Sequence, residues 1–303
     1  MYTIETSRVI EKLDKVQHYN EMRNVIIKHE IFQNVKDYSK EKEKVTAYFE
    51  IGKLVSEAGS IYGNNTINEF SKKLTNEFGK TYSYRNLVNY RKFYNIFKDE
   101  KLNALRSKLS WTHYRELIKL KDIEEIIYYI EVCLNQHLSY RKLSDKIKNK
   151  EYDRLDYNTK LKLINNEEST VIDLVKNPVK IKNNSNYEII SEKVLQKLIL
   201  EDIENFLEEL GNGFTFIKSE YPIKFEEKYN YVDLLLYNIK FKCYVVTELK
   251  ITELKKEHTG QIQTYMNYID ENIKTIEESK TVGIIICKKI INMLSNIVRM
   301  IEL

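Results

Sequence analysis

Two apolar segments in the C-terminal third of the chain place three charged residues at the spacing of β-strands. Residues 231–237 and 241–249 are rich in Val, Leu, Tyr and Phe, and the residues between them favour a turn, so the pattern predicts a β-hairpin. Asp233 lies in the first segment, while Glu248 and Lys250 lie at the end of the second. Charged groups are costly to bury unless they are paired, so these three side chains constrain how the hairpin folds.

The register of this hairpin decides whether the three charges meet. With the turn centred on 239–240, Asp233 pairs with Val246, and Glu248 lies two residues further along on the same face. Because side chains alternate with a period of two, Lys250 shares that face. A slip of one residue would separate Asp233 from the other two. We therefore expect the three groups to converge, on condition that this register holds.

The residue types in this group suit a metal-dependent phosphodiesterase. Asp233 and Glu248 offer hard oxygen ligands for Mg²⁺ or Mn²⁺, and such an ion can polarise a phosphoryl oxygen and generate hydroxide. Lys250 can orient the attacking water or offset charge in the transition state. The spacing alone is equally compatible with an ordinary strand that begins at Asp233 and a surface ion pair between Glu248 and Lys250.

Composition predicts a soluble chain of more than one domain. The 303 residues are 42% apolar and 31% charged, with only two prolines and eight glycines, which argues against a disordered chain and suggests about two domains. The three cysteines have no paired spacing, so we expect free thiols in a reducing cytoplasm. We find no signal peptide and no run that approaches the roughly 20 apolar residues of a membrane helix.

Positive charge is concentrated in the N-terminal half. Residues 51–150 carry 19 Lys and Arg against 11 Asp and Glu, although the whole chain has a net charge of only +4. The candidate metal site lies in the other half, which is mildly acidic. This separation favours a module that holds nucleic acid, with DNA as the partner, joined to a module that does chemistry.

The basic region contains a candidate helix-turn-helix. Residues 67–78 and 84–97 have helical periodicity, and Gly79 separates them, so they fit two helices around a short turn. The second helix, and a later one at 139–150, offer basic and amide side chains to DNA. The candidate DNA-binding residues are Arg85, Asn89, Arg91, Lys92, Arg141 and Lys142. The alternative is an amphipathic helix whose basic face is simply solvated.

The C-terminal region has a different order of predicted elements. A helix at 191–210 and a strand at 214–225 precede the hairpin, and a helix at 255–269 and an apolar strand at 281–287 follow it. The order is αβββαβ, and its last step implies a right-handed crossover. The predicted division is a helical domain at 1–155, a linker at 156–188 and an α/β domain at 189–303.

Several stretches between residues 46 and 288 resemble a known family in sequence and in order. They are IGKLVSEAGSIYG, INEFSKKLTNEFG, YSYRNLVNYRKFY, LSWTHYREL, FLEELGNGFTFI, YVDLLLY, YVVTELKITELKKEHTGQIQTYMNYID and TVGIIICK. With these stretches, the chain resembles the YhcG-like family of PD-(D/E)xK nucleases. The resemblance implies an all-α, winged-helix-like DNA-binding domain followed by an α/β restriction-endonuclease-like domain. It also implies Mg²⁺-dependent nuclease activity and a role in DNA recombination or repair.

The resemblance also assigns residues. Asp233 and Glu248 match the metal-binding acids, Lys250 matches the catalytic lysine, and Gln261 matches a polar residue of the following helix that approaches the site. The proline that names the wider fold is absent before Asp233, where Val232 stands.

Two further departures concern the completeness of the site. The first helix of the family's nuclease domain often carries a metal-binding glutamate, and the matching position here is Gln196, a weaker ligand. We do not expect Glu192 or Glu201, four and five residues away, to substitute for it easily. The family pattern also continues past the last strand, whereas this chain reads KKIINMLSNIVRMIEL and ends. We therefore expect a truncated sheet that loses a strand or exposes an edge.

Three functions from different classes fit these observations. The first is a Mg²⁺-dependent DNA nuclease, in recombination, repair or defence against mobile elements. The second is a DNA-binding protein whose nuclease domain has decayed, which Gln196 and the C-terminal sequence favour. The third is a scaffold in a defence system, without chemistry of its own. The sequence is compatible with a homo-oligomer but does not set the oligomeric state.

Overall fold

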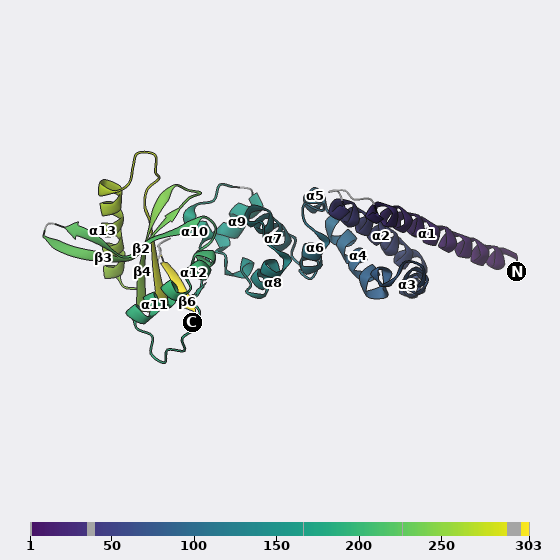
Figure 1. Ribbon diagram of the computed structural model, residues 1–303. Coiled ribbons are helices and arrows are strands. Elements are labelled where there is room, and N and C mark those ends of the chain that lie inside the picture. Colours follow the sequence, from purple (N-terminus) through teal and green to yellow (C-terminus); the bar gives the residue numbers. More distant parts are fainter. Residues whose placement is uncertain (1, 35–39, 166, 226, 290–297, 303) are drawn as a thin grey trace. The chain divides into compact units, whose positions relative to one another are not determined.

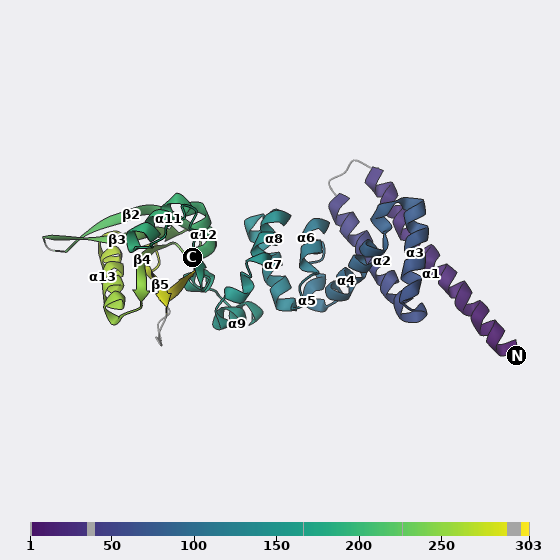
Figure 2. The same cartoon turned by 90° about the horizontal axis from the view of Figure 1, so that it is seen from below.

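The computed structural model divides into two compact units, residues 1–149 and 150–303. The residues that it describes are 2–34, 40–165, 167–225, 227–289 and 298–302. Figures 1 and 2 show that the first unit is built from helices and the second from a sheet with helices on both faces. The order of a helical region and an α/β region with a mixed sheet confirms the fold class predicted from the sequence at this level.

The described part of the first unit contains helices and no β-strand. The α-helices are α1 (Tyr2–Asn34), α2 (Lys40–Tyr62), α3 (Asn64–Phe78), α4 (Tyr84–Phe97), α5 (Glu100–Asn103), α6 (Trp111–Leu117), α7 (Ile123–Gln136) and α8 (Tyr140–Lys148), with a short 3₁₀ turn at Lys80–Tyr82. Helices α3 and α4 lie where the two helices of the candidate helix-turn-helix are predicted. Gly79 between them has φ of 89°, a value that glycine adopts without steric strain.

An aromatic core joins α2, α4 and α6. The rings of Tyr48 and Tyr90 stack with their centroids 4.2 Å apart, and Trp111 lies edge-on to Tyr48 at 5.0 Å. Gly52 lets α4 approach α2 closely, because a Cβ at this position would lie 2.1 Å from the Tyr90 carbonyl oxygen. Trp111 is therefore a core residue that fixes α6 against the two longer helices.

The second unit begins earlier than the predicted α/β domain. Its elements are a 3₁₀ turn (Tyr152–Arg154), α9 (Tyr157–Asn165), α10 (Val171–Leu174), β1 (Val179–Lys180), α11 (Glu192–Glu201), α12 (Ile203–Leu210), β2 (Phe214–Phe225), β3 (Lys228–Asn238), β4 (Cys243–Glu253), α13 (Lys256–Asn272), β5 (Val282–Lys289) and β6 (Val298–Glu302). The helix predicted at 191–210 is divided at Asp202, whose backbone is not helical. The segment 156–188, predicted as a linker, contributes two helices and a strand to this unit.

Buried ion pairs hold the start of this unit against α12. The Arg154 guanidinium reaches Glu209, with Nη1 2.6 Å from Oε2, and Lys176 lies 3.2 Å from Glu151. All four side chains are almost completely buried. Burial alone would raise the pKa of Glu209, but the hydrogen bond from Arg154 and the charge of Lys176 outweigh it and lower that pKa.

The sheet has six strands in the order β1-β6-β5-β4-β3-β2. Strands β2, β3 and β4 are antiparallel, whereas β4, β5, β6 and β1 run parallel. From the sequence we expected the sheet to end at the apolar strand β5. In the structure, β6 and β1 continue the sheet beyond β5. Met300 of β6 pairs with Cys287, and Val179 of β1 pairs with Ile301, so a strand from before the hairpin covers the edge.

The hairpin register differs from the prediction by two residues. Val246 pairs with Leu235 rather than with Asp233, and Asn238 pairs with Cys243. The predicted pairing was wrong because the turn is centred one residue further along the chain than assumed: the four residues 239–242 connect Asn238 to Cys243. Since the displacement is an even number of residues, each side chain keeps its face.

Helices cover both faces of the sheet, so the second unit has three layers (Figures 1 and 2). On one face, α11 and α12 bury Leu198 and Phe206 against alternate residues of β3 and β4, such as Leu234. On the other face, α13 buries Ile262 and Ile269 against the residues of β3 and β4 that point the opposite way. The connection β4-α13-β5 joins two parallel strands by the expected helical crossover.

Candidate metal-dependent nuclease site

The two predicted acids lie where β3 and β4 stop pairing. The ladder between the strands ends at Leu234 and Thr247, although each strand continues beyond that pair. Asp233 and Glu248 are the next residues on their strands. Asp233 Oδ2 accepts a hydrogen bond of 2.8 Å from the backbone amide of Leu249, which fixes one carboxylate oxygen and leaves the other available.

Glu248 is a buried acid whose charge is not fully compensated. Its side chain is almost inaccessible, and its Oε1 has no hydrogen-bond partner among the described residues. Burial, and then the charge of Asp233, raise the pKa of Glu248 to about 7, although Lys250 opposes the shift. Burial also raises the pKa of Asp233. Two such carboxylates need a cation near them.

Lys250 supplies part of that positive charge. Its Nζ lies 3.3 Å from Glu248 Oε2 and 3.7 Å from Glu192 Oε2. Burial alone would lower the pKa of Lys250, but the charges of Glu248, Asp233 and Glu192 outweigh burial and raise it. The ion pair between Lys250 and Glu248 is therefore buried, which differs from the surface pair that the spacing also allowed.

Helix α11 brings two polar residues to this group. Ser191 caps the helix by accepting a hydrogen bond from the backbone amide of Val194, and Glu192 and Gln196 follow one turn apart on the same side. Gln196 Nε2 donates to the backbone oxygen of Asp233 at 3.0 Å, so its amide supports the strand. Glu192 instead points its carboxylate toward Lys250. The prediction that Glu192 does not contribute to the site was made without regard to its spacing of one helical turn from Gln196, which was the signal for it.

Helix α13 places Gln261 beside Tyr265. Gln261 Nε2 donates to the Tyr265 hydroxyl at 2.8 Å, and in the described part of the chain Gln261 makes no hydrogen bond to either acid. The pKa of Tyr265 is raised by burial and also by the charges of Glu248 and Asp233. Gln261 thus lies next to the site and reaches it through this tyrosine.

These residues suit a divalent cation. In the part of the chain that the structure describes, no group of three or more His, Cys, Asp or Glu is arranged to hold a metal ion. The two acids nevertheless provide hard oxygen donors, and Glu248 Oε1 is a buried acceptor that lacks a donor. Mg²⁺ requires few protein carboxylates because it keeps several waters, so the donor set fits such an ion.

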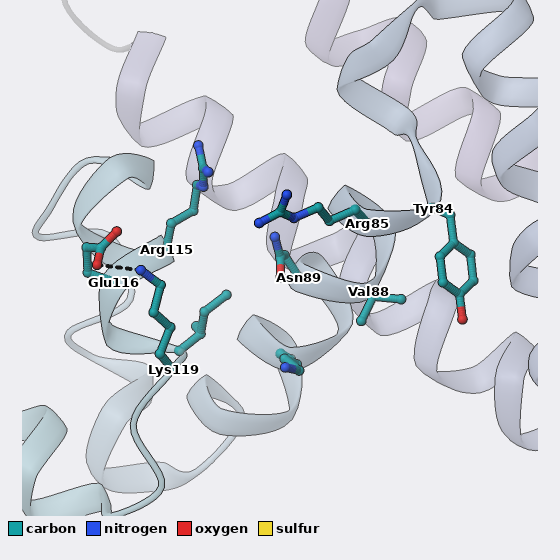
Figure 3. Close-up of a pocket in the computed structure, with 9 residues that line it drawn as sticks. Tyr84, Arg85, Val88, Asn89, Arg115, Glu116 and Lys119 are labelled. Carbon is teal, nitrogen blue, oxygen red and sulfur yellow. Dashed lines mark hydrogen bonds and ion pairs between the residues drawn. The ribbon is translucent and has the colours of Figure 1, made fainter.

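Three of the six candidate DNA-binding residues lie together in the first unit. Arg85, Asn89 and Lys92 line a hollow beside α6, while Arg91 is half-buried and does not line it. Figure 3 shows Arg85 and Asn89 on one side of this hollow. The other two candidates, Arg141 and Lys142, are exposed at the start of α8.

Two family descriptions match the chain. The YhcG PDDEXK nuclease domain matches residues 172–296, and the DUF1016 N-terminal domain matches residues 26–154. Both matches agree with the division into a helical and an α/β unit. The chain belongs to the YhcG-like family of PD-(D/E)xK nuclease-domain proteins. The resemblance seen in the sequence is thereby confirmed.

A curated member of this family matches most of the chain. It is "Putative nuclease YhcG" of Escherichia coli (strain K12), which is 22% identical over 282 residues that cover 79% of this chain and 75% of that protein. No solved structure matches the chain. Among the described residues, no helix combines the length and the hydropathy needed to span a membrane.

Proposed function

We propose that this protein is a metal-dependent nuclease that hydrolyses phosphodiester bonds in DNA. The observation that carries the proposal is the pair of acids at the end of the β3–β4 ladder, where Glu248 Oε1 is buried without a partner beside Asp233. An ordinary structural ion pair would leave no buried carboxylate oxygen unsatisfied. A buried acceptor of this kind is expected where a ligand completes the site.

Each residue of the site has a proposed role. Asp233 and Glu248 would hold the ion, Mg²⁺ or Mn²⁺, which when bound polarises the scissile phosphate and stabilises the leaving oxygen. Lys250 lies 3.3 Å from Glu248 and would orient the attacking water or offset charge in the transition state. Gln261 would position Tyr265 under the site through their hydrogen bond.

Glu192 is proposed as the third acid of the site. Gln196 occupies the position where the resemblance implies a glutamate, and it binds a backbone oxygen instead. Glu192, one helical turn earlier, directs a carboxylate to Lys250 from 3.7 Å. This carboxylate can orient Lys250 or a water molecule on the ion, so the site keeps three acids despite the substitution at Gln196.

The first unit is proposed to bind the DNA substrate. Two helices with a short turn between them, α3 and α4, support a helix-turn-helix here, and α4 buries Leu87, Tyr90 and Phe93 while Arg85 and Lys92 stay exposed. The β-hairpin of a winged helix has no counterpart among the described residues of this unit. A role in DNA recombination, repair or defence against mobile elements in the cytoplasm extends this proposal.

A DNA-binding protein with an inactive nuclease domain is the second candidate. The specific observation in its favour is Gln196, because a neutral amide at this position is a weaker metal ligand than a carboxylate. In this case the acids would stay protonated or paired with Lys250, and DNA would bind without being cut.

Cleavage assays separate the two candidates. The wild type is compared with Asp233→Asn and Lys250→Ala on supercoiled, linear and branched DNA, in Mg²⁺, Mn²⁺ or EDTA. We expect cutting by the wild type only when metal is present, and a loss of about two orders of magnitude or more in each variant. Glu271→Gln, at an exposed position of α13, is the matched control and should cut like the wild type. Equal cutting by wild type and both variants would remove the assigned site, and binding without any cutting would favour the second candidate.

A further inference from the structure

The hollow in the first unit is formed by two helices that the aromatic core holds together. Tyr114 of α6 packs against Phe93 and Phe97 of α4, with ring centroids 5.0 and 5.1 Å apart. The next residue of α6, Arg115, therefore lies at the edge of this contact, and Lys119 follows one turn later. The hollow has a volume of about 550 Å³.

Positive charge lines this hollow from both sides. Arg85 and Lys92 come from α4, and Arg115 and Lys119 come from α6 and the turn that follows it. Figure 3 shows Arg85 and Arg115 on opposite sides of the space between the two helices, with Lys119 on the side of Arg115. All four side chains belong to exposed residues, so they are accessible to a ligand.

Most of this charge is not compensated within the protein. Glu116 is the acid that lines the hollow, and it pairs with Lys119 at 2.5 Å. Among the residues that the structure describes, Arg85, Lys92 and Arg115 form no hydrogen bond or ion pair with a neighbour. Cations that face one another across a hollow repel, and a bound polyanion would remove this repulsion.

The lining also contains apolar and amide groups. Val88 and Ile118 form an apolar wall, and the Asn89 amide lies among the cations of α4. The phosphates of a DNA duplex lie on its outer ridges, so a flat basic face is enough to bind them. An apolar wall and an amide inside a hollow suit a sugar and a base, which an unpaired strand can insert without breaking base pairs.

We propose that the hollow between α4 and α6 binds a nucleotide of an unpaired DNA strand, with Arg115 and Lys119 as phosphate ligands opposite Arg85 and Lys92. This inference rests on the proposed DNA substrate and deepens it. It assigns to the protein a preference for single-stranded ends, flaps or branches over uninterrupted duplex. It also assigns a binding role to α6, which lies outside the helix-turn-helix.

Binding in EDTA tests this preference separately from cleavage. Fluorescence anisotropy measures the affinity of the full chain for a labelled single strand, a duplex and a duplex with an unpaired flap, at several salt concentrations. The variant Arg115→Ala/Lys119→Ala is compared with Lys42→Ala/Lys53→Ala, which removes the same charge from exposed positions of α2. Asn89→Asp, which adds a carboxylate to the hollow without removing a cation, is the second variant.

We expect the variants of the hollow to lose affinity for unpaired DNA and to keep most of their affinity for duplex. Arg115→Ala/Lys119→Ala should weaken binding to the single strand and the flap by about tenfold or more, and lower the salt slope for the single strand by about 1.4. Binding to the duplex should change much less, the α2 control should behave like the wild type, and Asn89→Asp should show the same selectivity. Unchanged binding of all three DNAs, or equal loss on all three, would overturn the inference.

A competition experiment decides whether the hollow binds a DNA strand or a small phosphate compound. If thymidine monophosphate or inorganic phosphate displaced the strand at concentrations near those of the oligonucleotide, the hollow would be a small-molecule site and the inference would fail. Failure to cut DNA in the assay above would leave these binding results unaffected. If the wild type bound no DNA at all, the proposed function itself would be lost, so the two failures are distinguishable.

Discussion

Replacement of Glu248 by glutamine should stabilise the second unit while it removes the metal site. Burial and the charge of Asp233 raise the pKa of Glu248 from an ordinary value of 4.5 to about 7. A carboxylate with a higher pKa in the folded state binds its proton more tightly there than in the unfolded chain. The fold therefore loses stability as the pH rises from about 4.5 to about 7 and the buried group ionises.

The size of this effect follows from the two pKa values. Each tenfold change in proton affinity corresponds to about 1.4 kcal/mol, so ionised Glu248 costs the metal-free fold about 3 kcal/mol at pH 8. Glu248→Gln has no proton to lose over this range. The difference in unfolding free energy between the variant and the wild type should therefore grow by about 3 kcal/mol between pH 4.5 and pH 8.

Urea unfolding in EDTA measures this difference across the pH range. Circular dichroism in the strand region follows the sheet, and Trp111, the single tryptophan of the chain, lies in the first unit and provides an internal control. The tryptophan transition should not shift between the two proteins. Mg²⁺ at pH 8 should stabilise the wild type but not the variant, because an ion that binds only the folded site adds its binding free energy to folding.

The decisive observation is how the difference in unfolding free energy between the variant and the wild type changes with pH. Any change in packing or hydrogen bonding caused by the glutamine shifts the two curves by a constant amount. A difference in unfolding free energy that is the same at pH 4.5 and pH 8 would show that Glu248 is not an uncompensated buried acid. The proposed reason for a cation at this site would then be lost.

Three further changes test other parts of the structure. Gly52→Ala should destabilise the first unit by about 3 kcal/mol or more, because its Cβ would lie 2.1 Å from the Tyr90 carbonyl oxygen; a tryptophan melting temperature within 2 °C of the wild type would contradict this. Arg154→Ala should lower the unfolding free energy of the second unit by about 3–5 kcal/mol, because it leaves Glu209 buried without its partner; an unchanged urea midpoint by circular dichroism would exclude that role. Glu192→Gln should raise the Mg²⁺ concentration needed for half-maximal cleavage by about tenfold, and an unchanged metal titration would exclude a third acid.

The local helical signals were sufficient to predict much of the first unit. Gly79 and the apolar periodicity on either side of it place α3 and α4, and α4 begins and ends at the predicted residues. These signals are reliable because a helix closes its hydrogen bonds within a few residues of sequence. The sequence did not predict that α6 would pack beside α4, since that contact depends on rings brought together from three helices.

The sequence by itself also predicted that Asp233, Glu248 and Lys250 lie on one face of the hairpin. Side-chain alternation along a regular strand depends only on residue parity, so a pairing error of two residues leaves this prediction unchanged. Which residues lie opposite depends on the length of the turn, and the structure pairs Leu235 with Val246. The face on which a side chain lies is set along one strand, whereas the pairing register depends on how two strands meet.

Only the tertiary structure decided which groups complete the site and the sheet. Glu192 reaches Lys250 because α11 packs beside the end of the ladder, and β1 reaches β6 because the segment predicted as a linker folds back onto α12. Both contacts join residues far apart in the chain, and their energies come from burial and pairing that no local pattern records. The sequence therefore specified the charges and their face, and the packing of distant elements decided their environment.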